Sequence, residues 1–243
     1  MDKFIGKRLD GRYEIHDLLG VGGMAYVYRA YDRIENRWVA IKILKEELSD
    51  NSEFLRRFRN ESKAIAVLSH PNIVKVYDVS FGDRIQYIVM EFIDGITVAD
   101  AMIGEHYDYP TAKKALIGVC DALTLLHEHR LVHRDVKPEN VMVTPDGRVV
   151  LIDFNASRQI TSAEKDTVIM GTFGYIAPEQ LGVLQSDVRT DIYAVGVLLN
   201  VMLTGKHPSE EIVKGRAGHI VRKCTAVNPD ERYQSAQKLV DAL

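Results

Sequence analysis

Eight residues, 133–140, combine the polar groups that phosphoryl-transfer chemistry needs. The segment reads His-Arg-Asp-Val-Lys-Pro-Glu-Asn and lies between two apolar runs, as loops that hold catalytic groups often do. Asp135 and Lys137 are two residues apart, so in extended backbone their side chains can point the same way. Asn140 adds an amide oxygen. A proton acceptor, a cation and a metal ligand fit phosphoryl transfer, although a salt-bridged surface turn would use the same residues.

A second group of candidates is a lysine on a strand and a glutamate on a helix. Residues 38–44 are rich in β-branched and apolar types and predict a strand that carries Lys42. Ser52 can cap a following helix, in which Glu61 falls within an apolar stripe. Pairing Lys42 with Glu61 would neutralise two charges that are costly to bury alone. The equal alternative is that Glu61 lies at the edge of the stripe, in water.

A glycine cluster lies between two strand patterns, with glycines at positions 20, 22 and 23. Glycines let backbone amides approach a phosphate, but many hairpins also carry them. The residues that follow are β-like rather than helical, which argues against a dinucleotide-binding fold. No Gly-Lys-Ser/Thr follows either, so the cluster is not a P-loop.

Length and composition allow one large domain or two small lobes with a cleft between them, since the chain has 243 residues. A net charge of −3 favours neither nucleic acid nor an anionic membrane surface as a partner. Cys120 and Cys224 are far apart in sequence and are typical of buried, reduced residues of a cytosolic protein. Residues 1–8 do not resemble a secretory signal, and the apolar run 192–203 is too short to cross a bilayer. We therefore expect a soluble cytoplasmic chain.

The pattern of elements predicts an α+β protein with a small β-rich lobe, about 9–93, and a larger, mainly helical lobe, about 96–243. Gly95 marks the break between them. Pro110 can open a long amphipathic helix. The other expected elements are strands at 72–80, 85–91, 140–143 and 149–152, a helix within the small lobe, and helices from about 175 to the end.

Several motifs then follow one another in a fixed order: the glycine loop, Val39-Ala40-Ile41-Lys42, Glu61, His133-Arg134-Asp135, Asp153-Phe154-Asn155 and Ala177-Pro178-Glu179. Together they resemble the eukaryotic-type serine/threonine protein kinase family over residues 9–243. The glycine loop and His70-Pro71-Asn72 look like the bacterial branch, which includes membrane-anchored kinases with extracellular PASTA repeats. The resemblance implies a single bilobal protein-kinase domain, either free in the cytoplasm or the cytoplasmic part of a longer anchored protein.

The resemblance assigns ATP binding to the small lobe and the segment after it. Lys42, positioned by Glu61, would hold the α- and β-phosphates, and Met90 would be the gatekeeper beside the adenine. Met142 would close the adenine from the other side. The predicted ATP-binding residues are Leu19, Gly20, Val21, Gly22, Gly23, Met24, Ala25, Tyr26, Val27, Ala40, Lys42, Met90, Glu91, Ile93 and Met142.

The resemblance also assigns the catalytic and metal-binding roles. Asp135 would accept the proton of the substrate hydroxyl, and Lys137 would steady the γ-phosphate. Asn140 and Asp153 would ligate Mg²⁺, with Mn²⁺ as an alternative ion. Thr172 would bridge Asp135 and Lys137, which favours serine and threonine over tyrosine as acceptors.

Regulation is expected through the loop that precedes Ala177. Arg134 beside Asp135 can pair with a phosphate on that loop. Thr161, Ser162 and Thr167 are the candidate phosphosites, modified by autophosphorylation within a transient homodimer. All three would be ordinary polar loop residues if the hypothesis is wrong.

The sequence departs from the family in two places. Asn155 replaces the usual glycine, and asparagine tolerates a positive φ better than most residues, so we expect activity to be kept. The spacing from Glu179 to Arg232, the expected buried ion pair, is short, which predicts an abbreviated substrate-docking helix.

Two other functions compete with an active protein kinase that has protein substrates and no nucleic-acid or membrane partner. A pseudokinase that serves as a binding or scaffold module predicts damage at Lys42, Glu61, Asp135, Asn140 or Asp153, and none is damaged. A small-molecule phosphotransferase of related fold would usually lack the Ala-Pro-Glu segment and the long loop, which residues 153–179 contain.

Overall fold

Two structural units make up the chain: residues 1–69 with 74–94, and residues 70–73 with 95–243. The structure is a computed structural model, and it describes residues 3–48, 55, 58–59, 62, 65–81, 85–154, 158–159, 174–181 and 186–243. The change from one unit to the other after Asp94 coincides with the break predicted at Gly95.

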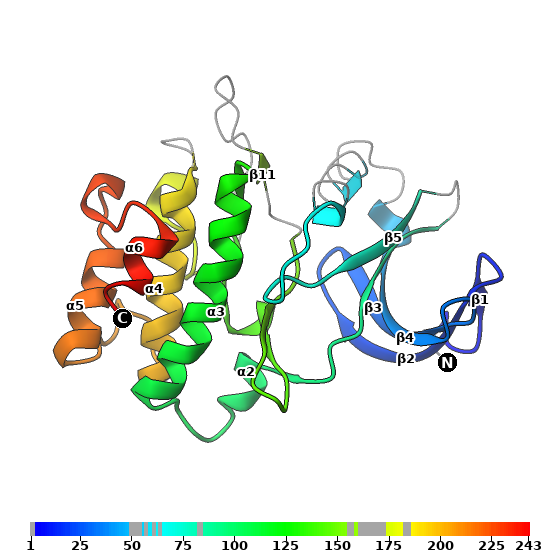
Figure 1. The fold of residues 1–243 in the computed structure, drawn as a ribbon, viewed down its shortest axis with the longest axis horizontal. Helices are drawn as coiled ribbons and strands as arrows, with labels where there is room; N and C mark the ends of the chain where they lie inside the picture. Colours follow the sequence, from blue (N-terminus) through cyan, green and yellow to red (C-terminus); the bar gives the residue numbers. More distant parts are fainter. Residues whose placement is uncertain are drawn as a thin grey trace. The chain divides into compact units, whose positions relative to one another are not determined.

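Unit 1 is built on a six-stranded antiparallel sheet with the order β1-β2-β3-β4-β6-β5 (Figure 1). Consecutive strands pair through short turns, except that β6 inserts between β4 and β5. The elements are β1 (Arg8–Leu9), β2 (Tyr13–Val21), β3 (Ala25–Asp32), β4 (Arg37–Leu44), the short 3-10 helix η1 (Glu46–Leu48), β5 (Val76–Phe81) and β6 (Gln86–Glu91).

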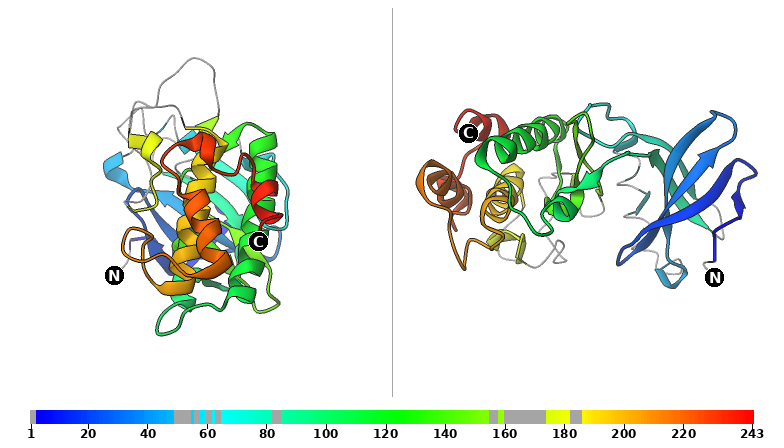
Figure 2. Two further views of the ribbon diagram at one scale, coloured as in Figure 1. Left: turned by 90° about the vertical axis from the view of Figure 1, so that its left-hand side faces the viewer. Right: turned by 90° about the horizontal axis from the view of Figure 1, so that it is seen from below.

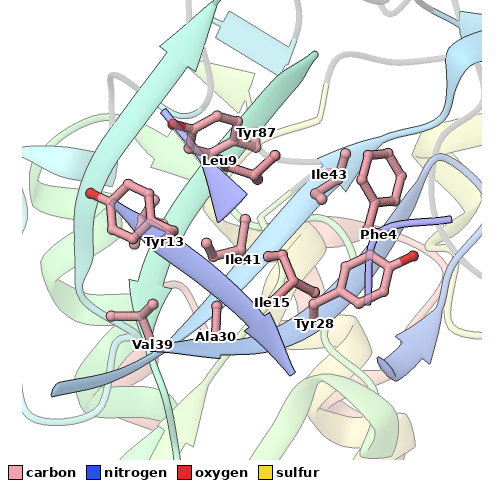
Figure 3. Close-up of a cluster of buried hydrophobic side chains, with 11 residues drawn as sticks. Phe4, Leu9, Tyr13, Ile15, Tyr28, Ala30, Val39, Ile41, Ile43 and Tyr87 are labelled. Carbon is pink, nitrogen blue, oxygen red and sulfur yellow. The ribbon is translucent and has the colours of Figure 1, made fainter. Parts of the chain in front are cut away.

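Strand β4 forms where its alternating apolar residues predict it, and both of its faces are covered. One face carries Val39, Ile41 and Ile43, which lie in a buried cluster with side chains from β2, β3 and β6 (Figure 3). Leu44 belongs to a second cluster with Ile88. A strand at the centre of a sheet is buried on both sides, which explains why all its residues from 39 to 44 are buried.

The strand predicted at 72–80 is wrong at its start, because residues 70–73 belong to unit 2. The Asn72 carbonyl accepts a hydrogen bond from the Leu151 N–H at 2.8 Å, and its side-chain amide donates to the Val149 carbonyl at 2.6 Å. Ile73 forms an isolated parallel bridge with Leu151. Because of these non-local bonds, β5 begins only at Val76. The local composition does not reveal the bonds.

Unit 2 is mainly helical, and α3 and α4 run side by side (Figures 1 and 2). Helix α3 begins as predicted: Pro110 lies in its first turn and the Asp108 carboxylate accepts the Thr111 N–H at 2.9 Å. Its predicted apolar face is buried. The helices are α2 (Val98–Ala101), α3 (Tyr109–Glu128), α4 (Val188–Thr204), α5 (Gly215–Cys224) and α6 (Ala236–Val240), with 3-10 turns η2 (Pro138–Asn140), η3 (Pro178–Leu181) and η4 (Pro229–Glu231).

Short strands connect the helices and bracket the polar segment 133–140. A three-stranded sheet has the order β10-β9-β7, and β11 pairs with β8. The predicted strands near 140–143 and 149–152 are confirmed as β9 and β10. The bounds are β7 (Ile96–Thr97), β8 (Leu131–Val132), β9 (Val141–Val143), β10 (Val149–Leu151) and β11 (Arg158–Gln159).

Helix α4 is the central helix of unit 2, and it packs closely against α5. A Cβ atom added at Gly196 would lie 2.3 Å from the Cys224 Cβ, so only glycine fits this crossing. Gly205, with φ of 69°, ends α4 in the left-handed conformation. Residues 205–214 then form turns without a helix, which agrees with the abbreviated segment expected there. Within the described part of the chain, no helix has the length and apolar character needed to span a membrane.

Candidate active site

The segment 133–140 joins β8 to β9, and one buried carboxylate anchors its start. The backbone N–H groups of His133 and Arg134 donate to the two oxygens of Asp191, at 3.0 and 2.8 Å. Asp191 lies in the first turn of α4 and is 0% exposed. His127, at the end of α3, contacts the same carboxylate through Nε2 at 2.7 Å. Two helices and the loop therefore meet at Asp191.

The pKa of Asp191 shows that its partners compensate for the hydration that this carboxylate loses on burial. Burial by itself raises the pKa of a carboxyl group, because the charged form loses its hydration. The hydrogen bond and charge of His127 and the N–H of Arg134 outweigh burial and hold the pKa of Asp191 below its usual value. The ionised form is thus the one that the fold favours.

Two residues of the site have backbone conformations that non-glycine residues rarely adopt. Arg134 has φ of 69° and Asp153 has φ of 61°. Such conformations carry strain and persist where surrounding contacts enforce them. For Arg134 these contacts include its N–H, which donates to Asp191 at 2.8 Å, and its carbonyl, which accepts from Gln180 at 3.3 Å.

Asp135, Lys137 and Asn140 lie within hydrogen-bond distance of one another. The Lys137 Nζ is 3.2 Å from the Asp135 Oδ2. The Asn140 Nδ2 donates to the same oxygen at 2.9 Å and to the Asp135 backbone carbonyl at 2.8 Å. The predicted proximity of these three residues is therefore observed, with an acceptor held between a cation and an amide.

His133 is fully buried and supports this cluster through its ring. Its Nδ1 accepts the Asp135 N–H at 3.3 Å, and its ring meets Phe154 edge-on at a centroid distance of 4.9 Å. Burial lowers the pKa of His133, and the carboxylates of Asp191, Asp135 and Asp153 only partly oppose that shift. The neutral ring is the form that can accept the Asp135 N–H.

Asp153 follows β10, which brings it beside Asn140. The Ile152 N–H donates to the Asn140 carbonyl at 2.9 Å, so the residue before Asp153 is tied to the second predicted metal ligand. Pairing of β9 with β10 fixes this arrangement. Asp153 and Asn140 have twelve residues between them in the sequence, and they thus lie on neighbouring backbone segments.

In unit 1, Lys42 shares a sheet face with the residues predicted to contact adenine. It pairs with Val27 on β3 and Ile88 on β6, and Ala40 pairs with Met90. Directly opposed residues project from the same face of a sheet. Lys42 is 7% exposed.

The glycine cluster forms the hairpin between β2 and β3. Gly20 pairs with Val27, and the Gly22 N–H donates to the Ala25 carbonyl at 2.9 Å. Two register shifts interrupt β2. Among the described residues, no atom lies within 4 Å of a Cβ atom added at Gly20 or Gly23, and Leu19 and Val21 are exposed, so the tip of the hairpin is open to an incoming ligand.

The remaining predicted adenine contacts lie on both units. Glu91 ends β6, and its N–H donates to the Lys75 carbonyl at 2.8 Å. Ile93 is buried two residues later in the connection between the units. Met142 lies on β9 of unit 2 and is partly exposed.

Comparison with known families decides what this arrangement is. The sequence model of a family described as "Protein kinase domain" matches residues 13–242. The chain belongs to the protein kinase family. The predicted resemblance is confirmed, and with it the α+β kinase fold of a β-rich unit followed by a helical one.

Named relatives of this kinase domain are bacterial serine/threonine-protein kinases. The probable serine/threonine-protein kinase CPE1738 of Clostridium perfringens is 38% identical, over 98% of this chain and 39% of that protein. PrkC of Bacillus subtilis is 34% identical, over 97% of this chain and 40% of that protein. The kinase domain thus spans about two fifths of the length of these relatives.

A solved structure shows the same fold. The crystal structure of the Mycobacterium tuberculosis PknI kinase domain covers 100% of this chain with a TM-score of 0.78 and 28% identity. The alignment includes 98% of the PknI domain. Architecture and sequence therefore agree on the family.

Several predicted residues of the kinase domain lie outside the described residues. They are Glu61, Asn155, Thr161, Ser162, Thr167 and Thr172. The pairing of Lys42 with Glu61, the bridge from Thr172 and the phosphosites therefore remain predictions.

The donor set of the site fits a hard divalent cation such as Mg²⁺. Because the Asn140 Nδ2 is directed to Asp135, its Oδ1 is the amide atom that can face a metal, and Asp153 supplies a carboxylate from the residue after Ile152, whose N–H bonds the Asn140 carbonyl. Among the described residues no group of three or more His, Cys, Asp or Glu side chains could hold a metal alone. Mg²⁺ commonly takes one or two protein ligands and completes its shell with phosphates and water.

Sequence reasoning missed two residues that support the segment 133–140. His127 contacts Asp191, and the Gln180 Nε2 donates to the Arg134 carbonyl at 3.3 Å. Both act on groups distant in sequence, so no local pattern reveals them. The sequence gives a hint only for His127, which ends an otherwise apolar stretch, because Gln180 follows the charged Glu179.

Proposed function

We propose that this domain transfers the γ-phosphoryl group of Mg-ATP to serine and threonine hydroxyls of proteins. The observation that supports this most strongly is the Asp135 carboxylate, held by Lys137 and Asn140 on a loop anchored to Asp191. Phosphoryl transfer depends on positioning and charge neutralisation rather than on covalent catalysis. The cluster supplies both positioning and charge neutralisation.

Asp135 is the proposed proton acceptor. A general base must lie within hydrogen-bond reach of the hydroxyl that it deprotonates, and Asp135 is only partly buried, so a substrate can approach it. Lys137 lies 3.2 Å from its carboxylate and would turn to the γ-phosphate when ATP is bound. Lys42 and the hairpin of Leu19–Val27 would bind the other phosphates.

Asn140 and Asp153 would hold the divalent ion. Bound there, Mg²⁺ neutralises the charge of the phosphates and of the transferred group, and Mn²⁺ is an alternative. The chain's own contribution is to fix the two ligands through the β9–β10 pairing and the Ile152 hydrogen bond.

Val27, Ala40 and Met142 are the residues proposed to contact adenine, with Met90 as gatekeeper. Because the Glu91 N–H donates to Lys75, its carbonyl is the group proposed to meet the adenine edge, together with the backbone of Ile93.

Regulation by autophosphorylation is part of the proposal. Thr161, Ser162 and Thr167 are the candidate sites, modified in a transient homodimer, and the guanidinium of Arg134 would bind the resulting phosphate. Phosphosite mapping after incubation with Mg-ATP tests this claim. Absence of phosphate between residues 155 and 172 would reject it.

The proposed setting is the cytoplasm, with other proteins as substrates, either as a free domain or as part of a longer anchored protein. The free, buried thiols of Cys120 and Cys224 are compatible with a reducing compartment. Thr172, with Lys137, would select serine and threonine acceptors.

One assay distinguishes this function from that of a pseudokinase. Purified protein is incubated with Mg²⁺ and γ-labelled ATP, alone and with a generic basic protein, and nucleotide binding is measured in parallel. The proposal predicts labelled protein for the wild type and none for Asp135→Asn. ATP binding without transfer would favour a pseudokinase, and neither binding nor turnover would reject the kinase assignment.

A further inference from the structure

The turn segment 205–214 contacts the stretch before Ala177 through one histidine. The His207 Nε2 lies 2.7 Å from the Gly174 carbonyl oxygen. A carbonyl only accepts, so Nε2 carries the proton in this contact. In the neutral ring Nδ1 is then an acceptor, and it receives the Ser209 N–H at 3.1 Å and the Ser209 hydroxyl at 2.7 Å.

A buried asparagine gives the segment that carries His207 a fixed shape. Asn200 on α4 is 0% exposed. Its Nδ2 donates to the carbonyls of Lys206 and Glu211 at 2.8 and 2.7 Å, and its Oδ1 accepts the Val213 N–H at 2.9 Å. A fully bonded buried amide rigidifies its surroundings, so His207 projects from a support that α4 holds in place.

The stretch that His207 contacts is tied at its other end to the catalytic loop. The Gln180 Nε2 donates to the Arg134 carbonyl, and its Oε1 accepts the Ala177 N–H at 2.9 Å. Residues 174–180 therefore run from His207 to the residue adjacent to Asp135. A polypeptide whose hydroxyl is placed at Asp135 would therefore lie next to the residue to which this stretch is bonded.

We infer that His207 is a positioning residue for the protein substrate. Its bond holds Gly174, whose φ of 96° is a conformation that side chains rarely adopt, and so fixes residues 174–176 as the surface that receives an extended peptide next to the acceptor hydroxyl. This inference rests on the proposed function and adds a residue that determines how peptides, rather than ATP, bind.

The substitutions His207→Gln and His207→Asn distinguish this role from a role in folding the segment 205–214. In His207→Gln the side-chain amide nitrogen can occupy the place of Nε2 and donate to Gly174. In His207→Asn the shorter amide can only occupy the place of Nδ1, which meets Ser209. His207→Ala removes both contacts, and His219→Ala, an exposed histidine on α5, is the matched control.

The test measures steady-state phosphorylation of histone, with KM determined separately for histone and for ATP. We expect His207→Ala and His207→Asn to raise KM for histone about three- to tenfold, the loss typical of one hydrogen bond, while His207→Gln and His219→Ala stay close to the wild type. The change should fall on KM for histone and not on KM for ATP.

The outcomes that overturn the inference are distinct from failure of the proposed function. An active wild type whose histone KM does not change in His207→Ala overturns the inference alone. Rescue by Asn and not by Gln also overturns it, because the histidine would then only support Ser209. A wild type that transfers no phosphate overturns the proposed function, and the inference with it.

Discussion

At the scale of single residues, the site is defined by what surrounds each polar group. An aspartate two residues before a lysine is common on protein surfaces. Asp135 differs because its N–H, its carbonyl and its Oδ2 all have partners, in His133 and Asn140. These contacts fix the carboxylate in one orientation before any substrate arrives.

His133 gives a pH-dependent prediction at this scale. Its folded-state pKa is lowered below the ordinary 6.5 by burial, so on acidification the unfolded chain takes up the proton first. The free energy of unfolding should therefore fall as the pH drops below about 6.5, and His133→Phe should reduce the slope of that fall. Urea unfolding at several pH values measures the slope.

The matched control is His219→Phe, on the exposed face of α5. Its slope should equal that of the wild type. A His133→Phe variant with the full wild-type slope would show that His133 is not the residue whose protonation weakens the fold.

The sequence points more readily to the residues proposed to act in catalysis than to the residues that support them. Asp135, Lys137 and Asn140 are recognisable because they are close in sequence and polar within apolar surroundings. His127 and Gln180 are not, because each bonds a group 46 or more residues away. Their importance follows from the tertiary structure alone.

At the scale of elements, α4 organises unit 2, and an ion pair links its start to the C-terminal region. The Arg232 guanidinium donates to both Glu179 oxygens, at 2.7 and 2.9 Å, and Thr190 of α4 donates to the same carboxylate at 2.9 Å. The side chains of Arg232 and Glu179 are 0% and 3% exposed. Removal of one partner leaves a buried charge uncompensated.

Glu179→Gln should therefore destabilise the domain by about 3–5 kcal/mol. Urea unfolding at neutral pH measures the loss. In the double variant Glu179→Gln with Arg232→Met, much of the loss should be recovered, because no unpaired charge remains. A single variant within 1 kcal/mol of the wild type, or losses that simply add in the double variant, would contradict this role of the pair.

Elements with strong periodicity were predictable, and elements made by long-range pairing were not. Strand β4 and helix α3 follow from alternation and from an amphipathic stripe with a cap. The two-residue strands β7, β8 and β11 exist only because distant backbone lies beside them, and β5 starts late because residues 70–73 bond to β10 and its neighbours.

At the scale of the whole molecule, both cysteines report on the unfolding of unit 2. Cys120 on α3 and Cys224 on α5 are 0% exposed, and burial raises the pKa of Cys120 to about 12. Burial also raises the pKa of Cys224. The Cys224 side chain packs against Gly196 of α4.

We expect both thiols to react with a disulfide reagent such as DTNB only as fast as the domain unfolds, because the thiolate is the reactive form and neither group is ionised or accessible. Absorbance at neutral pH measures the rate, and protein in guanidinium, in which both should react at once, is the control. Rapid labelling in native buffer would contradict the burial of the two thiols on α3 and α5.

The central claim is that the Asp135 cluster carries out phosphoryl transfer, and single-turnover kinetics test it most directly. Wild type, Asp135→Asn and the exposed control Asp121→Asn of α3 are each saturated with Mg-ATP and mixed with acceptor protein. We predict a transfer rate for Asp135→Asn that is about 10²–10⁴-fold below the wild type, the usual contribution of a general base, with unchanged transfer in Asp121→Asn. Equal rates in wild type and Asp135→Asn would contradict the claim.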